Sequence, residues 1–281
     1  MTNISLNIKP NNAEYNCPLC QKELLLSGAT FRCENNHCFD KAKQGYVNLL
    51  PVQYKHSKAP GDNKAMVEAR RAFLDKGFYQ PLVDSMNALQ QKYNIADSNL
   101  LDAGCGEGFY THQHKVDKEN QSNTVYGVDI AKEAIKIAAK RYKYCHFSVG
   151  TLSKLSFRDN FFSWITSVYA PILEKEFTRV LKDDGYLLTV TPAEKHLFEL
   201  KSLIYIEAQT HDITKPTITG LTLIEEQHLT YPMTFNDSAD VLNLLAMTPF
   251  AFKASAEVIA NIKTKSSFIC QADFVIRLYQ K

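Results

Sequence analysis

The sequence predicts an α/β protein with a doubly wound, mostly parallel sheet, preceded by a small cysteine-rich segment. From residue 80 onward, short β-branched and aromatic runs alternate with helical patterns, which is typical of strands that pair in parallel. A glycine-rich turn at residues 104–108 directly follows the first of these runs, and four of the seven cysteines fall within residues 17–38. Sheets of this type bind ligands beyond the carboxyl ends of their strands, so we expect the functional site there.

The individual elements follow from local patterns. Apolar residues recur at helical spacing over 81–93 and predict a helix. The segment 131–142 consists mainly of good helix formers, and 172–181 is expected to form a further helix. Strands are expected at 99–104, 124–130, 145–150, 161–170, 185–191 and 272–280.

The composition is that of a folded chain without a membrane segment. Hydrophobic residues make up 45% and charged residues 22% of the 281 residues, which excludes wholesale disorder. The net charge of +2 is too small to imply a polyanionic partner by itself. The first residues lack the pattern of a secretory signal, and no run of about 18 apolar residues occurs, so we expect no membrane partner. Clustered cysteines fit a metal site in a reduced cytoplasm better than a disulfide scaffold.

Charge divides the chain into three zones. Residues 1–40 are cysteine-rich and nearly neutral, whereas residues 41–76 hold eight Lys and Arg against three Asp and Glu. The alternation of strands and helices begins at residue 80. We therefore expect domains at 1–40, 41–79 and 80–281, the middle one being a basic linker.

The glycine loop points to a particular cofactor. Gly104, Gly106 and Gly108 allow the backbone to turn tightly and to approach a ligand closely. A dinucleotide-binding loop would place its third glycine one residue later, and Asp102 would repel a pyrophosphate but would tolerate a cationic sulfonium. Asp129 ends the next strand, where it could accept hydrogen bonds from both ribose hydroxyls of an adenosine. The combination predicts binding of S-adenosylmethionine; the alternative is an ordinary tight turn.

The cysteine cluster predicts zinc. Cys17 and Cys20 are spaced as in a zinc ribbon, Cys33 follows, and His37 and Cys38 are adjacent candidates for the fourth ligand. A segment of about 40 residues has too small a hydrophobic core to fold without a stabilising metal ion. The alternative is a set of small buried thiols. The spacing alone does not decide whether His37 or Cys38 is the fourth ligand.

Several stretches resemble one family, the large-subunit ribosomal RNA guanine-N1 methyltransferases of the RlmA (RrmA) type. They run in the family's order over nearly the whole chain. The stretches are "CPLC", "HCFDKAKQGYVNLLPVQ", "PGDNKAMVEARRAFLDKGFYQPL", "LDAGCGEGFYTH", "GVDIAKEAIKIAAKRY", "YAP", "VTPAEKHLFELK" and "YPM…LLAMTPFAF".

The resemblance implies a class I S-adenosylmethionine-dependent methyltransferase fold, Rossmann-like with a mostly parallel seven-stranded sheet, behind a zinc-binding RNA-recognition domain. It favours His37 over Cys38, so that the implied zinc ligands are Cys17, Cys20, Cys33 and His37.

It also implies cofactor contacts from Tyr79, Tyr110, Thr111 and His196. Without the resemblance, Tyr79 would be interpreted as a core aromatic and His196 as a solvated polar residue.

The implied reaction is methyl transfer to N1 of a single guanosine in a hairpin loop of 23S ribosomal RNA. The long match over residues 37–62 favours position 745 over the neighbouring position 748. Guanine N1 carries a proton that must be accepted, but the sequence identifies no base. Tyr169 and Asp102 are candidates by position only, and Tyr169 could instead stack on the guanine or simply close the pocket floor.

Residues 41–76 are expected to follow RNA phosphates, with Tyr46 and Tyr54 available for stacking on bases; the alternative is a solvated linker. A homodimer could present two such basic faces to one RNA. Two other functional classes stay open at this stage. One is a small-molecule methyltransferase with a structural zinc cap, and the other is a non-catalytic zinc-containing RNA-binding protein.

Overall fold

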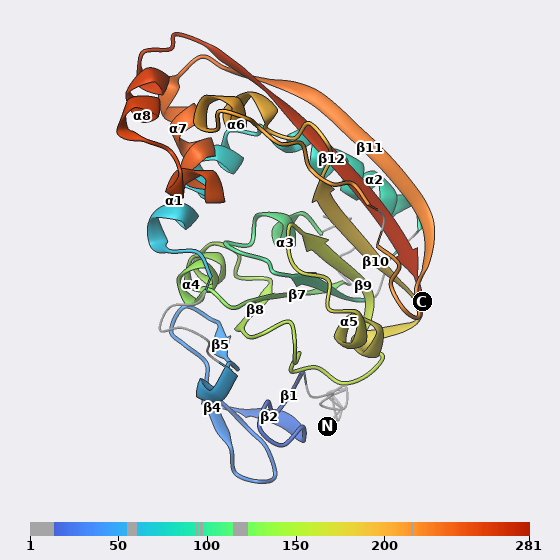
Figure 1. Cartoon of the computed structure of the whole chain (residues 1–281). Coiled ribbons are helices and arrows are strands. Elements are labelled where there is room, and N and C mark those ends of the chain that lie inside the picture. The colour runs from blue at the N-terminus through green and yellow to red at the C-terminus, as the bar shows by residue number, and fades with distance from the viewer. Residues whose placement is uncertain (1–13, 55–60, 94, 96–97, 115–122, 215) are drawn as a thin grey trace, which may run out of the picture.

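The centre of the molecule is a mixed sheet with the strand order β11-β12-β10-β9-β6-β7-β8-β5 (Figure 1). It is seen in a computed structural model that describes residues 14–54, 61–93, 95, 98–114, 123–214 and 216–281. The strands are β5 (Val47–Asn48), β6 (Asn99–Ala103), β7 (Thr124–Asp129), β8 (His146–Val149), β9 (Phe162–Val168), β10 (Leu181–Pro192), β11 (Thr222–Phe235) and β12 (Phe268–Gln280).

The sheet is parallel from β5 to β10, and only the β12 and β11 pairings are antiparallel. The mostly parallel, doubly wound fold class is therefore confirmed. The expected number of seven strands was wrong for the described sheet, because the short strand β5 of the basic segment adds an eighth strand beside β8. Strand β10 also begins at Leu181, four residues before the predicted start, with an irregular register up to Tyr186.

Eight α-helices surround this sheet in the described part of the chain. The predicted helices correspond to α2, α4 and α5, the helices expected directly after the glycine loop and from His196 onward correspond to α3 and α6, and α1, α7 and α8 were not predicted. The helices are α1 (Lys64–Asp75), α2 (Gln80–Lys92), α3 (Phe109–Gln113), α4 (Lys132–Arg141), α5 (Glu174–Val180), α6 (Phe198–Ile204), α7 (Ser238–Ala246) and α8 (Ala256–Lys263), with short 3₁₀ turns at Val52–Tyr54 and Pro249–Phe252. None of the described helices is long and apolar enough to cross a bilayer.

The two faces of the sheet bury different partners, because successive residues of a strand point to opposite sides. On β6, Leu100 packs into a core with α1, α2 and α4, whereas Leu101 packs into a second core with α5. The second core also contains Tyr15, Leu24 and Phe31 of the N-terminal segment. The cysteine-rich segment thus covers part of a sheet face.

That segment is a small antiparallel sheet of β1 (Tyr15–Asn16), β2 (Glu23–Ser27), β3 (Thr30–Arg32) and β4 (Cys38–Asp40), which lies at the opposite end of the molecule from α6 to α8 (Figure 1). The backbone N–H of Asn16 donates to the carbonyl of Ser156 at 2.9 Å. The Tyr15 ring lies edge-on to Tyr126 of β7 and beside Phe157. These contacts hold the small sheet of residues 15–40, called the ribbon below, directly against the large sheet.

Candidate functional site

A cavity of about 870 Å³ opens at the carboxyl ends of five neighbouring parallel strands, β8, β7, β6, β9 and β10. The chain leaves β6 toward β7 on one side and returns to β9 on the other, so the cavity lies at the switch point where such sheets bind ligands. The position of the site is the one that the strand pattern predicts.

The glycine loop forms one wall of this cavity. Gly104, Gly106 and Gly108 all have positive φ values, of 82°, 53° and 82°. Gly104 and Gly106 line the cavity, whereas Gly108 is the N-cap residue before α3 and packs against Phe147 of β8. A Cβ on Gly108 would meet the Phe147 ring at 2.9 Å, so this third glycine serves the packing of helix on sheet.

Asp129 ends β7 and holds the loop from the neighbouring strand. Its carboxylate accepts hydrogen bonds from the backbone N–H groups of Gly106 at 2.9 Å and of Ala131 at 2.7 Å. Burial raises the pKa of Asp129, and these two hydrogen bonds oppose that rise. A carboxylate has about four acceptor positions, so two remain for ligand hydroxyls.

Asp102 and Thr111 lie behind the loop rather than in the cavity wall. The hydroxyl of Thr111 donates to the Asp102 carboxylate at 2.6 Å, and only 1% of Asp102 is exposed. Burial raises the pKa of Asp102 to about 7. Asp102 therefore fixes the start of α3 against β6, and no ligand in the cavity could reach it as the loop stands.

A charged cluster that the sequence reasoning missed lies against the glycine loop and includes one of its residues, Glu107. Arg70 of α1 forms an ion pair with Asp62 and lies 4.0 Å from a carboxylate oxygen of Glu107. That Glu107 oxygen, Oε2, is buried without a hydrogen-bond partner among the described residues, and burial raises the pKa of Glu107 to about 7. Glu107 could have been noticed because it stands inside the glycine motif, but nothing local marks Arg70.

Two tyrosines meet one histidine at the β9 and β10 side of the cavity. The Nε2 atom of His196 lies 3.0 Å from the Tyr169 hydroxyl and 3.3 Å from the Tyr79 hydroxyl. The Nδ1 atom accepts the backbone N–H of Asp273 at 3.1 Å. Burial lowers the pKa of His196 to about 3, so the ring is neutral at pH 7.

His211 was also missed. It lines the cavity next to His196, with the two ring centres 6.3 Å apart, and its Nε2 atom has no partner among the described residues. Burial and the nearby Lys201 lower the pKa of His211. The segment Met247–Phe250 closes the cavity from the α7 side, and the carbonyl of Met247 accepts a hydrogen bond from Arg70.

Six of the nine residues predicted to bind the cofactor line this cavity, and three lie behind its wall. Those in the wall are Tyr79, Gly104, Gly106, Tyr110, Asp129 and His196. Those behind it are Asp102, Gly108 and Thr111, which support the loop.

The cavity fits S-adenosylmethionine in its chemistry. Asp129 offers acceptors for ribose hydroxyls, and the Glu107 oxygen that accepts no hydrogen bond among the described residues favours a cationic ligand. Arg70 beside it offers a cation for a carboxylate. The zwitterionic amino-acid end of the cofactor would thus find both of its charges matched.

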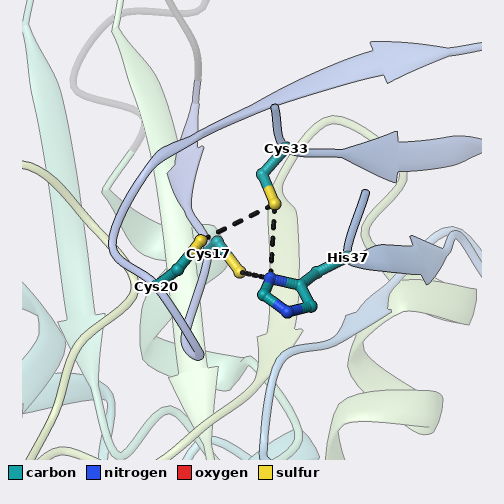
Figure 2. A group of neighbouring side chains, drawn as sticks. All are labelled: Cys17, Cys20, Cys33 and His37. Atoms are coloured by element: carbon teal, nitrogen blue, oxygen red, sulfur yellow. Dashed lines mark hydrogen bonds between the residues drawn. The ribbon is translucent and has the colours of Figure 1, made fainter. Parts of the chain in front are cut away.

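The predicted zinc ligands come together at one point of the ribbon (Figure 2). The ligand atoms of Cys17, Cys20, Cys33 and His37 all lie within 4.8 Å of one another. The Nδ1 atom of His37 lies 3.5 Å from the Cys17 sulfur and 3.4 Å from the Cys33 sulfur, and the Cys20 and Cys33 sulfurs are 3.7 Å apart. A tetrahedral zinc ion separates its sulfur and nitrogen ligands by about 3.5–3.8 Å. Four ligands close the coordination sphere, as in a structural site.

Cys38 lies outside this group. Its side chain is exposed and its sulfur contacts the carbonyl of Asn36 at 3.4 Å. The backbone carbonyl of His37 accepts the N–H of Cys33, which closes the turn that presents the imidazole. The arrangement supports His37 as the fourth ligand.

The basic segment differs from the expectation in two respects. Tyr46 is buried, with 6% exposed, so it is not available to stack on a base. Arg70 lies in the cofactor cavity and not on an open basic surface. Tyr54 is half-buried beneath Lys154. Lys55 and Lys58 lie outside the described residues.

Comparison with known proteins agrees with both sites. A family model described as "RlmA, N-terminal" matches residues 15–58, and one described as "Methyltransferase domain" matches residues 95–237. YxjB of Bacillus subtilis (strain 168), named "Putative 23S rRNA (guanine-N(1)-)-methyltransferase", is 29% identical over 280 residues, which are 95% of this chain and 97% of that protein.

Two further relatives match a shorter part of the chain. The 23S rRNA (guanine(748)-N(1))-methyltransferase of Streptomyces fradiae is 36% identical over 187 residues, 66% of this chain and 65% of that protein. A protein of Micromonospora griseorubida that carries the same description as YxjB is 33% identical over 205 residues, 66% of this chain and 67% of that protein.

The zinc ribbon is the domain for zinc, and the methyltransferase domain is the domain for S-adenosylmethionine. The family expected from the sequence is confirmed by the two family models and by the curated relatives. The protein belongs to the RlmA-type family of 23S rRNA (guanine-N1)-methyltransferases.

Proposed function

We propose that the protein transfers the methyl group of S-adenosylmethionine to N1 of one guanosine in a hairpin loop of 23S ribosomal RNA, in the cytoplasm. The observation that carries this proposal is the joint presence of a cofactor cavity at the switch point and a ribbon of the RlmA type docked on the same sheet. Neither a small-molecule enzyme nor a non-catalytic binding protein needs both features.

We propose position 745 as the modified guanosine, on the long match of residues 37–62 to that type. Position 748 is the second candidate, because the relative from Streptomyces fradiae is named for it. The two positions can be separated by primer extension, since a methyl group on N1 blocks base pairing. The protein is incubated with labelled cofactor and unmodified 23S RNA, and the reverse-transcription stop is mapped. A stop at neither position, or label only on small molecules, would overturn the proposal.

The bound cofactor supplies an electrophilic methyl group on a sulfonium. In the proposed function, the cavity holds it with Asp129 toward the ribose hydroxyls and with Arg70 and Glu107 toward the amino-acid end. The protein's part in such a displacement is mainly alignment of the acceptor nitrogen in a site shielded from water. The segment Met247–Phe250, which closes the cavity beside Arg70, supplies part of that shield.

The proton of guanine N1 leaves before or during attack, and its electron pair becomes the nucleophile. His211 is our candidate acceptor, because its Nε2 atom is unpartnered in the described cavity and its lowered pKa keeps the ring neutral at pH 7. Asp102 does not serve this role in the proposal, because it lies behind the loop with its carboxylate bonded to Thr111.

A further inference from the structure

We propose that the hydroxyl of Tyr169 donates a hydrogen bond to O6 of the target guanine and stabilises the base after N1 has lost its proton, with His196 as the residue that positions this hydroxyl. The inference rests on the proposed function and names how the acceptor base is recognised and activated. It starts from the direction of three hydrogen bonds around His196.

The first step concerns the proton on His196. The backbone N–H of Asp273 points at Nδ1 from 3.1 Å, so Nδ1 is the acceptor and carries no hydrogen. A neutral imidazole has one N–H, which must then be on Nε2. The Asp273 carboxylate does not compete for the ring, because its two oxygens accept from Thr230 and from the backbone of Lys195.

The second step follows the chain of donors to Tyr169. The Nε2–H of His196 can only donate, so the Tyr169 oxygen, 3.0 Å away, must accept. The hydroxyl hydrogen of Tyr169 is then directed elsewhere, and no other partner for it occurs in the described part of the chain. Tyr79 contacts the same Nε2 atom from 3.3 Å but is 97% buried, whereas Tyr169 is 46% exposed. Tyr169 therefore presents a hydrogen-bond donor to the cavity.

The third step concerns the strained backbone of Tyr169. Its φ is 56°, in the left-handed region that bulky residues rarely adopt. Such strain persists where the surroundings fix it, and it occurs often at functional sites. Here the N–H of Tyr169 is tied to the carbonyl of Val190 at 3.0 Å, and the next residue, Ala170, lies against Gly104 of the glycine loop. The strained turn therefore places Tyr169 in the cavity beside the glycine loop, which forms the expected cofactor-binding wall.

The last step is the chemistry of guanine. On its Watson–Crick edge O6 accepts a hydrogen bond, whereas the corresponding N6 of adenine donates one. Transfer of the N1 proton to Nε2 of His211, the acceptor named above, leaves a negative charge that N1 and O6 share. A fixed donor at O6 therefore binds the ionised base more strongly than the neutral base, as donors do in an oxyanion hole. N1 then attacks the methyl carbon, the carbon–sulfur bond breaks, and the electron pair stays on sulfur as a neutral thioether.

The test compares Tyr169→Phe with the wild type on an in vitro transcript of the 23S hairpin, in which the target is guanosine or 6-thioguanosine. We expect kcat at pH 7 to fall by about 10- to 100-fold with guanosine, with KM within about twofold. The loss should shrink toward pH 9.5, where N1 ionises without help, and should be smaller with 6-thioguanosine, whose N1 is more acidic. Tyr186→Phe removes a hydroxyl from β10 outside the cavity and is the control. A loss that is independent of pH, or that resides in KM, would overturn the proposal.

Two substitutions of His196 separate positioning from simple packing. His196→Gln keeps an N–H donor near Nε2, and His196→Asn keeps an acceptor near Nδ1 for the Asp273 N–H. We expect the Gln variant to retain most of the pH-dependent kcat and the Asn variant to lose it to the same extent as Tyr169→Phe. Equal losses in both variants would show that the donor to Tyr169 is irrelevant.

Nitrogen-15 NMR of the histidine rings tests the premise without RNA. We expect His196 to be a neutral Nε2–H tautomer that does not titrate between pH 5 and 9. An Nδ1–H signal would overturn this inference even if the enzyme methylates guanine N1. Methylation at another atom with the expected tautomer would overturn the proposed function and, with it, the role of Tyr169 at O6, but it would leave the hydrogen-bond arrangement around His196 intact.

Discussion

Gly104 and Ala170 lie so close together that a Cβ built on Gly104 would stand 2.5 Å from the Cβ of Ala170. The contact joins the loop after β6 to the turn after β9, two segments more than 60 residues apart in the chain. One segment lines the cofactor side of the cavity and the other presents Tyr169. The absence of a side chain at residue 104 thus sets the distance between the two halves of the site.

Gly104→Ala should damage the site more than the backbone strain alone would. Alanine at φ 82° is strained, and here its methyl group would also collide with Ala170. We expect a loss of about 2–4 kcal/mol in unfolding free energy and at least a tenfold loss in affinity for S-adenosylhomocysteine. Gly28→Ala is the matched control, because its φ is 63° and nothing lies within 4 Å. Urea unfolding and calorimetric titration measure both effects, and equal behaviour of the two variants would contradict the explanation.

The elements that a sequence reveals are those with a strong local period. Strands β6, β7 and β9 lie in the middle of the sheet and are rich in apolar, β-branched and aromatic residues that are almost all buried, so they were predicted within one or two residues. Helix α1 was missed because only four of its twelve residues are buried among many charges. Strand β5 has two residues and exists only because β8 offers an edge to pair with. Its formation is a tertiary effect that no local pattern encodes.

The same limit applies to the site. The glycine loop and Asp129 can be predicted because a motif and a strand end mark them. Arg70 could not, because its charge suggested an RNA contact until folding placed it between Asp62 and Glu107. His211 lies in a stretch without pattern and joins the cavity through the position of the segment after α6. Long-range packing, which local sequence does not report, decides these placements.

The zinc site predicts different fates for two adjacent residues. His37→Ala removes one of four closely spaced ligands, so it should lose most of the bound zinc and unfold the ribbon. Cys38→Ser changes an exposed side chain outside the cluster and should keep one zinc per chain. Metal content by atomic emission, with thermal unfolding in parallel, distinguishes the two variants. Zinc loss in the Cys38 variant together with retention in the His37 variant would reverse the ligand assignment.

Glu107 should make the stability of the protein without cofactor depend on pH in an unusual direction. Its pKa is about 7 in the folded state against an ordinary value of 4.5, so the folded protein holds a proton that the unfolded chain has released. The contribution of Glu107 to the free energy of unfolding is therefore fully present below about pH 4.5, declines as pH rises, and is lost above about pH 7. Glu107→Gln should remove about 3 kcal/mol of that decline. Urea unfolding from pH 5 to 8 measures it, with the exposed Glu133→Gln as control; parallel profiles for wild type and Glu107→Gln would contradict the argument.

Asp129→Asn should weaken cofactor binding although the side chain keeps its size. Both Asp129 oxygens accept backbone N–H groups, from Gly106 and Ala131, and an amide would turn its own N–H₂ toward one of these donors. We expect a 10- to 100-fold loss in affinity for S-adenosylhomocysteine by calorimetry, because an acceptor is lost and the loop is displaced. Asp183→Asn, a carboxylate with an 86% exposed side chain near the start of β10, should bind normally. Unchanged affinity in Asp129→Asn would exclude a role for this carboxylate in holding the loop or the ribose.

The cations of the basic segment should serve two different ligands, RNA and the cofactor. Lys41 and Lys43 are exposed beside the ribbon, so they can meet RNA phosphates, whereas Arg70 is held by Asp62 in the cavity wall. Each phosphate contact contributes about 0.7–0.9 to the slope of log affinity against log salt concentration. The double substitution Lys41→Gln, Lys43→Gln should therefore reduce the slope for 23S RNA by about 1.5 and leave affinity for S-adenosylhomocysteine unchanged.

Arg70→Gln should do the reverse, lowering cofactor affinity about tenfold at an unchanged slope, because a carboxylate would lose its charged partner. Filter binding at several salt concentrations and calorimetry decide between these outcomes, and a reduced slope in Arg70→Gln would return this arginine to the RNA-binding surface.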